Sequence, residues 1–422
     1  MALLTFWLLA VWTTLELFVV FDWNHGLARL ALLAVVAGLL WCFGEWAGRF
    51  ATLAPSGSAT RRVINLLIVG ALANAGVAAY FIDNTYRTGD VRSDQAHTVL
   101  DASRLLRQGL NPYSTAAVTD RAAHDLAVAA LDARAGCRAS AGTPTFRAGR
   151  AESDVVPQIV NSPECESIRR LFSSLGFKYG PVTLAFYTWF LIIFGPAGII
   201  SAHVLLIVAM VFILLSWGRD VSGSTFWPAF ALLPLLWPTH LAWNTLRFEH
   251  LDLPAVFLAI VGWRLYDRRK YGLAGASLGL SFAAKFLPAA VFLPLLSTAP
   301  RRAWIIAVAV IVAAFLPFAV WDATGLWHNV GYPFTRPPDS TAAAFFLPAT
   351  VWTLVKAASL LVAGVLAWRG HRALWDRQST VEYLCGAVLL VLASGATFHN
   401  NYLVWLPPVL GVFVVSNVSE HQ

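Results

Sequence analysis

The chain has 422 residues, of which 58% are hydrophobic and only 13% are charged. A soluble domain carries about 25% charged residues, so this composition excludes an ordinary soluble enzyme and indicates a polytopic membrane protein. The formal charge of +7 does not indicate nucleic-acid binding, because the basic residues stand in short clusters between apolar runs, where they orient membrane spans.

At the N-terminus we expect two membrane spans, at residues 2–21 and 29–47, followed by Arg61-Arg62 and a third span at 62–82. Apolar stretches of about 17–25 residues cross a bilayer as helices. The first stretch lacks the charged start and the small-residue cleavage site of a secretory signal peptide. We therefore divide the chain into a leading pair of helices, residues 1–61, and a larger module, residues 62–422.

A polar segment, residues 83–178, follows the third span and is expected to form a large outer loop. Its first part, residues 90–110, has the periodicity of an amphipathic helix on the membrane surface, with Asp90, Asp94 and His97 on one face. Asp90 and Asp94 are one turn apart, and like charges raise the pKa of one carboxylate. Such a carboxylate could act as a general base on a hydroxyl; the alternative is an ordinary solvated helix face.

A short apolar segment, residues 180–194, follows Lys178 and Tyr179. Lys178 could hold a phosphate as a point charge or anchor the chain at the membrane interface. A full crossing by this segment would place every later basic cluster on the wrong side of the membrane. We therefore expect it to enter the outer leaflet without crossing.

Spans at residues 197–217 and 224–243 lead to Glu249, His250 and Asp252, which open a further span at 249–266. Two acids and a histidine at a helix mouth could hold sugar hydroxyls, or a divalent cation through oxygen ligands. Asp252 also suits a helix N-cap with a proline in the first turn. A helix start does not require the other two residues.

Basic residues flank the apolar stretch 272–296 on both sides, at Arg268-Arg269-Lys270 and at Arg301-Arg302. A single crossing would put one of these clusters outside, so we expect two half-length helices that turn near Lys285. Lys285 stands alone in its apolar stretch. Its expected partner is an anion such as a lipid phosphate, although a long side chain can also snorkel to the interface.

The last spans are expected at residues 303–322, 343–367, 380–398 and 401–416. An outer loop holds Arg336, whose guanidinium can bind phosphate with two hydrogen bonds; an interfacial anchor is the alternative. His399 and Asn400 end an outward span and offer donors and acceptors to a sugar. The predicted fold is an all-α polytopic bundle of about 12 transmembrane helices, within a range of 10–13, with both termini cytoplasmic.

Four features in this order resemble the GT-C superfamily of integral-membrane glycosyltransferases. They are the acidic motif that continues to Asn111-Pro112-Tyr113, then Tyr179-Gly180-Pro181, then Glu249-His250-Leu251-Asp252, and last a glycine-containing helix that reaches Lys285-Phe286-Leu287-Pro288. The chain is most similar to the bacterial branch of polyprenyl-phosphomannose-dependent alpha-mannosyltransferases. The resemblance covers residues 62–410 and implies a GT-C-like bundle with juxtamembrane helices in a large first outer loop.

The resemblance also implies that an aspartate of the first outer loop is the catalytic base. This role fits Asp94 best, with Asp90 as its neighbour. The family usually has an aromatic residue after this aspartate and often a tyrosine three residues on, where this chain has Gln95 and His97. The candidates for the donor phosphate, chosen by their chemistry, are Lys178, Lys285 and Arg336. The candidates for sugar or acceptor contact are His97, Tyr179, Glu249, His250, Asp252, His399 and Asn400.

We therefore expect transfer of mannose, or another hexose or pentose, from a polyprenyl-phosphate donor to a lipid or glycan acceptor. The reaction would take place at the extracytoplasmic face, and the absence of sorting signals favours a bacterial inner membrane. The sequence has no Walker loop, dinucleotide fingerprint or HExxH zinc motif, so a divalent cation is the one optional cofactor.

Two alternatives stay open. A transporter or flippase of a lipid-linked or anionic solute would suit Lys285, but it predicts charges near the bilayer midplane, whereas nearly all candidates lie outward. A lipid-linked polysaccharide ligase would use similar outer-face cations.

Overall fold

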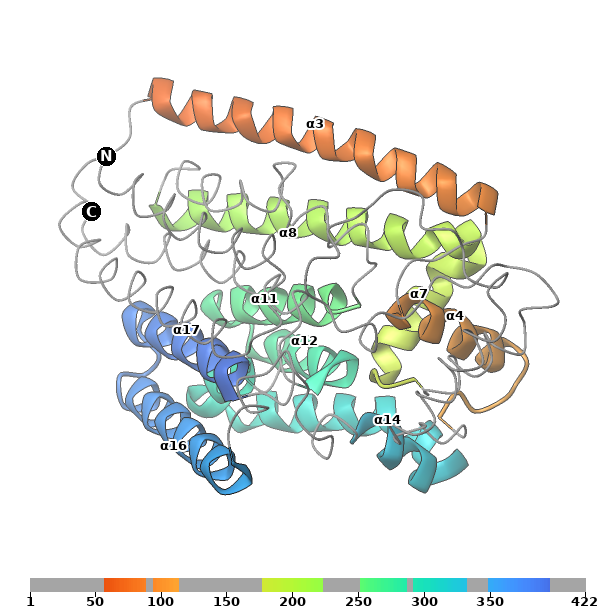
Figure 1. The fold of residues 1–422 in the computed structure, drawn as a ribbon. Coiled ribbons are helices and arrows are strands. Elements are labelled where there is room, and N and C mark those ends of the chain that lie inside the picture. Colours follow the sequence, from red (N-terminus) through yellow and green to blue (C-terminus); the bar gives the residue numbers. More distant parts are fainter. Residues whose placement is uncertain are drawn as a thin grey trace.

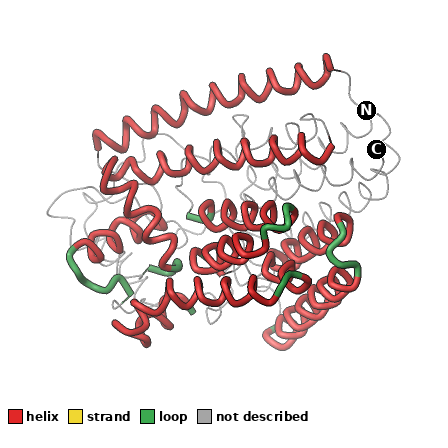
Figure 2. The backbone as a smooth tube through the Cα atoms, turned by 180° about the vertical axis from the view of Figure 1, so that it is seen from behind, coloured by secondary structure: helices red, strands yellow, loops and turns green. Residues whose placement is uncertain are grey.

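The computed structural model describes residues 57–88, 94–113, 177–222, 251–286, 291–331 and 348–394. Within these ranges every regular element is a helix (Figure 1), and the view from behind shows the same bundle (Figure 2). The all-α class is therefore confirmed for this part of the chain. The spans expected at 2–21, 29–47, 224–243 and 401–416 lie outside the described residues, so the count of about 12 crossings stays a prediction.

The helices follow one another as nine α-helices and two short 3-10 helices among the described residues. They are α3 (Gly57–Thr88), α4 (Asp94–Arg107), α7 (Pro181–Phe194), η4 (Gly195–Ala197), α8 (Gly198–Ser222), α11 (Leu253–Asp267), α12 (Tyr271–Ala284), η5 (Leu293–Thr298), α14 (Arg301–Val330), α16 (Ala349–Arg372) and α17 (Arg377–Ser394).

Four stretches are long and apolar enough to cross a membrane in the described part of the chain. They are Thr60–Arg87, Pro181–Asp220, Arg301–Trp327 and Thr350–Arg372. They contain the spans predicted at 62–82, 197–217, 303–322 and, for most of its length, 343–367. The chain is thus a polytopic membrane protein by the length and composition of its helices.

The short apolar segment before α8 is a helix of its own. α7 has 14 residues, a length of about 21 Å, and it ends at Gly195, whose φ of 59° lies in the left-handed region. η4 then redirects the chain, and α7 stands at a steep angle to α8 in both views (Figures 1 and 2). The prediction that residues 180–194 enter the outer leaflet without crossing stays a prediction, because the stretch that is apolar enough to span a membrane runs from Pro181 to Asp220.

The apolar stretch 272–296 turns back where the sequence predicts it. α12 ends at Ala284, and Lys285 has an extended backbone with φ −155° and ψ 128°. Of the return segment the structure describes residues 291–300, which are helical at 291–292 and then form the 3-10 helix η5. Tyr266 Oη, at the end of α11, lies 2.5 Å from Thr298 Oγ1, at the end of η5. The stretch therefore begins and ends at the same end of the bundle.

Small residues on α12 allow close packing against α14. A Cβ on Gly275 would overlap the carbonyl oxygen of Ala303, and a Cβ on Gly279 would lie 2.7 Å from that of Ala307. Both contacts advance by four residues on each helix, so the two helices run parallel. Close approach through small residues is typical of helix pairs in membranes.

The other side of α12 packs against α11, and α12 lies between α11 and α14 (Figure 1). Ser277 Oγ donates to the carbonyl oxygen of Leu258 at 2.8 Å, and Ser281 Oγ donates to that of Ala255 at 2.7 Å. These bonds run in opposite chain directions, so α11 and α12 are antiparallel. As a result the beginning of α11 meets the end of α12.

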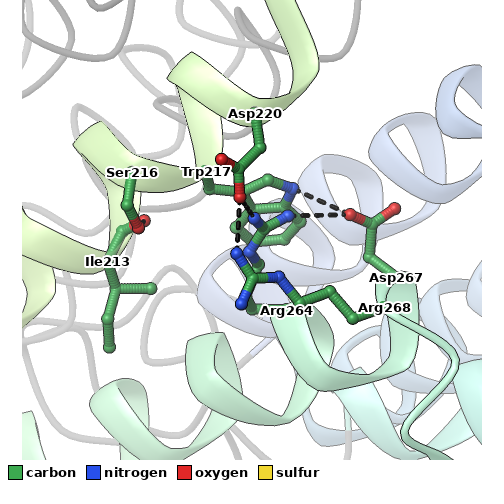
Figure 3. A network of polar contacts seen from close by, with 7 residues as sticks. All are labelled: Ile213, Ser216, Trp217, Asp220, Arg264, Asp267 and Arg268. Carbon is green, nitrogen blue, oxygen red and sulfur yellow. Dashed lines mark hydrogen bonds and ion pairs between the residues drawn. The ribbon is translucent and has the colours of Figure 1, made fainter.

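A charged network joins α8 to α11 at the other end of α11 (Figure 3). Arg264 pairs with Asp220, and its Nη1 donates to Asp267 Oδ2 at 3.0 Å. Trp217 Nε1 donates to the same carboxylate oxygen at 3.1 Å, and the guanidinium of Arg264 lies 5.2 Å from the centre of the Trp217 ring. Arg268 shares Asp220 with Arg264. The network fixes the end of α8 against the end of α11.

The turn between α16 and α17 joins this end as well. Ser297 Oγ, in η5, accepts a hydrogen bond from Trp375 Nε1 at 2.8 Å and lies 3.1 Å from His371 Nδ1. The basic residues near Arg264, those that flank 272–296 and those of 369–377 therefore gather at one end, called the basic end below. The positive-inside rule predicts this common side.

Candidate functional site

The opposite end of the bundle, called the site end, gathers elements that are far apart in the sequence. α4, the start of α7, the start of α11 and the end of α14 share one apolar cluster (Figure 1). Its members include Ala96, Val99, Ala102, Tyr113, Phe177, Leu184, Tyr187, Leu251, Leu326 and Val330. The described candidate polar residues lie on or next to the elements that form this cluster.

The predicted amphipathic helix forms. α4 spans Asp94–Arg107, so it ends before the predicted residue 110, while residues 90–93 lie outside the described part of the chain. It buries Val99 and Ala102, which helical periodicity places on the apolar face. The same periodicity predicts that Leu110 lies on the buried apolar face, and this prediction is wrong, because Leu110 is 52% exposed. The cause is local: the helix has ended, and Gly109 takes a φ of 72° that turns the chain away.

Asp94 is the first residue of α4 and His97 is the fourth, and the structure describes only the backbone of both. Asp101, further along the helix, makes a surface ion pair with Arg104 at 3.2 Å. The remaining candidates lie outside the described residues: Asp90, Glu249, His250, Arg336, His399 and Asn400.

Gln95 connects the beginning of α4 to the beginning of α11. Its Oε1 accepts a hydrogen bond from the backbone N–H of Leu251 at 3.1 Å. The residue before Gln95 is Asp94, and the residue after Leu251 is Asp252. The backbone of the predicted base is thereby held beside the mouth of α11. Gln95 stands where the resembling family has an aromatic residue, and no local sequence pattern indicates this contact.

Asp252 and Lys285 form a buried ion pair between the start of α11 and the end of α12. The side chain of Asp252 is 0% exposed and that of Lys285 is 16% exposed. Asp252 makes no side-chain hydrogen bond that caps α11, so its carboxylate serves the lysine instead of the helix end. The anion beside Lys285 is thus a residue of the chain itself.

Tyr179 lies against the same lysine. The ammonium nitrogen of Lys285 is 5.2 Å from the centre of the Tyr179 ring, a cation–π distance. The following residue, Gly180, donates its N–H to the carbonyl oxygen of Ala284 at 2.9 Å, and Thr183 Oγ1 donates to the same oxygen at 3.0 Å. A Cβ on Gly180 would overlap the backbone of α12. Lys178, partly buried, precedes this segment.

Tyr113 ties the residues after α4 to this segment. Its Oη donates to the carbonyl oxygen of Tyr179 at 2.9 Å, and its own carbonyl accepts from Asn329 Nδ2 at 2.9 Å. The ring packs edge-on against Phe318 with 5.1 Å between centres. Burial raises the pKa of the Tyr113 phenol well above its usual value, so the group stays a donor. The Asn111-Pro112-Tyr113 motif was the signal that could have singled it out.

A second buried polar pair lies beneath the site, between α7 and α8. Tyr187 Oη is 2.7 Å from His203 Nε2, and both side chains are fully buried. Both residues stand in apolar runs of the sequence, where no local pattern indicates their pairing.

No three His, Cys, Asp or Glu side chains lie together as metal ligands in the part of the chain that the structure describes. Asp252 is the one described member of the cation-binding trio considered from the sequence, and its carboxylate has an ammonium partner. The described residues by themselves therefore do not make a cation site.

The fold and the site define a class: an integral-membrane helical protein with an amphipathic helix and a buried lysine at one end of its bundle. The chain matches the model of glycosyltransferase family 87 over residues 177–395, slightly more than half of its length, and it belongs to that family, which is of the GT-C type. No curated protein and no solved structure matches the chain. The protein is therefore a membrane glycosyltransferase.

The matched region begins at the residue before Lys178 and ends just after α17. It contains Asp252, Lys285 and Tyr179 but not α4. The hydrogen bonds of Gln95 and Tyr113 therefore connect two parts of the chain. They join α4 and the turn that follows it to the region that matches the family.

Proposed function

We propose that the protein transfers a sugar from a polyprenyl phosphate to a hydroxyl of a lipid or glycan acceptor. The sugar is mannose or another hexose or pentose, and the site faces the extracytoplasmic side of a bacterial inner membrane. The observation that carries the proposal is the junction at the site end: α4 begins at Asp94 beside the mouth of α11, where Asp252 pairs with Lys285.

In the proposed reaction Asp94 takes the proton of the acceptor hydroxyl while the acceptor oxygen attacks the anomeric carbon. The bond from that carbon to the phosphate oxygen breaks, and its electron pair leaves with the polyprenyl phosphate. A direct displacement of this kind inverts the anomeric centre. General base catalysis contributes about 10²–10⁴-fold to such a step.

The leaving phosphate gains negative charge, so a fixed cation lowers the barrier. Lys285 suits this role because it is held between Asp252 and the Tyr179 ring at the end of α12. An ammonium in apolar surroundings keeps its charge only beside a counter-ion, which Asp252 supplies. Lys178 and Arg336 are the further proposed phosphate ligands, and removal of one donor in a comparable site costs about 10²–10³-fold in rate.

The proposed sugar and acceptor contacts follow from polar chemistry around this junction. They are His97, Tyr179, Glu249, His250, Asp252, His399 and Asn400, with Asp90 as the neighbour of the base. Tyr179 is the described member with an aromatic ring next to the buried cation, and a sugar ring can pack against such a face.

The test compares Asp94→Asn with Asp101→Asn in transfer from a radiolabelled polyprenyl-phosphate sugar. Asp94→Asn should lower turnover by about 10²-fold or more. Asp101→Asn lies on the same helix and removes only a surface ion pair with Arg104, so it should leave turnover within about twofold of the wild type.

An inactive Asp90→Asn beside an active Asp94→Asn would move the base to residue 90. Full activity in both variants would end the proposal of a carboxylate base in this helix.

A further inference from the structure

Four exposed cations stand together at the basic end. Arg269 and Lys270 form the turn between α11 and α12, and Arg301 and Arg302 form the first turn of α14. We call these four residues the basic shelf. The turn before α12 and the start of α14 lie at the same end of two packed helices, since a Cβ on Gly272 would lie 3.3 Å from the Ile306 side chain.

The carboxylates of the charged network at this end are already engaged. Asp220 and Asp267 pair with Arg264 and Arg268 (Figure 3). No ion pair joins the four shelf cations to any carboxylate of the described ranges. The positive charge of the shelf is therefore not neutralised by the described part of the protein.

The backbone adds to this positive charge. The first turn of α14 has no acidic residue, and Pro300 at its N-cap provides no side-chain cap. The N-terminus of a helix is the positive end of its dipole, where arginines are disfavoured. Arg269 also holds a φ of 57°, which is uncommon for a residue with a side chain. An anion bound here would relieve the repulsion.

The shelf lies at the end of a stretch that is long and apolar enough to span a membrane. Arg301 is the first residue of this stretch. Tyr266 and Tyr271 pack with their ring centres 5.5 Å apart, and Trp304 donates to the carbonyl oxygen of Leu296 at 2.7 Å. Tyrosine and tryptophan gather at the membrane–water interface.

We propose that the basic shelf binds the phosphate of an anionic phospholipid headgroup, of the phosphatidylglycerol or cardiolipin type. The site is separate from the site end and does not depend on the proposed reaction. A lipid is the source, rather than free phosphate, because the cations stand at the ends of apolar spans where headgroups are concentrated.

The test uses the full chain in nanodiscs of phosphatidylcholine alone or with phosphatidylglycerol, and follows thermal unfolding and binding of a short-chain phosphatidylglycerol. The variants are Arg301→Gln/Arg302→Gln, Arg269→Gln/Lys270→Gln and their combination. The matched control, Arg104→Gln/Arg107→Gln, removes two arginines from the last turn of α4 at the other end.

Phosphatidylglycerol should raise the unfolding temperature of the wild type and of the control. Each double variant of the shelf should bind the short-chain lipid about 30-fold less tightly, and the combined variant about 1,000-fold less tightly. In phosphatidylcholine alone the combined variant should unfold at the same temperature as the wild type or a higher one, because repulsion has been removed. A merely structural role predicts the opposite change.

Equal stabilisation of the wild type and the combined variant by phosphatidylglycerol would overturn the proposal. Stabilisation by inorganic phosphate in phosphatidylcholine nanodiscs that matches the lipid effect would identify a free-anion site and also overturn it. The two double variants keep the test decisive if the combined variant does not fold.

Discussion

Asp252 and Lys285 stand 33 residues apart in the chain. Asp252 precedes the first residue of α11, and Lys285 follows the last residue of α12. Burying a pair of charges gains little by itself, but removing one partner leaves an uncompensated buried charge and costs about 3–5 kcal/mol. Because Asp252 is fully enclosed, the penalty should fall at the upper part of this range when the lysine is the partner removed.

Lys285→Met should therefore destabilise the protein strongly, whereas Lys285→Met/Asp252→Asn should recover much of the lost stability. Transfer should be lost in both, because the double variant still lacks the cation for the leaving phosphate. Thermal unfolding and the radiolabel assay separate the two effects. Arg87→Met/Asp83→Asn, an exposed pair at 2.9 Å in α3, is the control and should change stability by less than about 1 kcal/mol.

Equal stability of the single and double variants would contradict the assigned role of the pair. Recovery of transfer in the double variant would remove Lys285 from the phosphate site while leaving the structural pairing intact.

Single residues were predictable from sequence where their surroundings made them unusual. Lys285 is isolated in an apolar run, and Asp252 begins one, so both were candidates. Their pairing was not predictable, since it depends on α11 and α12 being antiparallel with matched lengths. Gln95 and Tyr113 act through long-range hydrogen bonds, which leave no local pattern in the sequence.

At the scale of the element, α12 packs closely on α14 through two glycines. Gly275→Val and Gly279→Val should each push α12 away from α14, because their Cβ positions face the backbone at Ala303 and Ala307. Overpacking of this kind costs about 1–3 kcal/mol, measurable as a lower unfolding temperature in detergent. Gly364→Val in α16, where no atom lies within 4 Å of the Cβ position, is the matched control. A drop at Gly364 as large as at Gly275 would contradict the packing explanation.

Helix positions followed from hydrophobic length, but helix ends did not. The span predicted at 303–322 is part of a longer helix, α14, which continues to Val330 across a kink at Asp322. Asp322 has φ −161° and ψ 93°, and its Oδ1 accepts from the N–H of Gly325 at 2.8 Å. With this bond the helix resumes beyond the apolar run, and the hydropathy of the sequence does not indicate it.

At the scale of the whole molecule, the distribution of basic residues predicts which end of the bundle lies on which side of the membrane. With the four native cysteines replaced, Ser222→Cys and Ala299→Cys should be labelled by a membrane-impermeant maleimide from the same side of the membrane. Leu110→Cys, at an exposed position beyond α4, should react from the opposite side. These outcomes follow from the gathering of the basic clusters at one end and of α4 at the other.

Labelling of positions 222 and 299 from opposite sides would show that residues between them cross once more or once less than predicted. The reversal at Lys285, or the assignment of the span at 224–243, would then be wrong.

At this scale the sequence predicted the all-α bundle and the common side of the basic clusters, because bilayer thickness and charge bias act on composition. It did not predict which helices are neighbours. The position of α12 between α11 and α14 depends on serine and glycine contacts. The partners of these residues are known only once the chain is folded.

The antiparallel arrangement of α11 and α12 makes the length of α12 a fixed quantity. Inserting one residue between Tyr271 and Ala284 would rotate everything that follows by about 100° and advance it by about 1.5 Å. Lys285 would then point away from Asp252, and the carbonyl of Ala284 would miss Gly180. Working versions of this enzyme can therefore exchange side chains along α12, within the limits of size, but cannot change its number of residues.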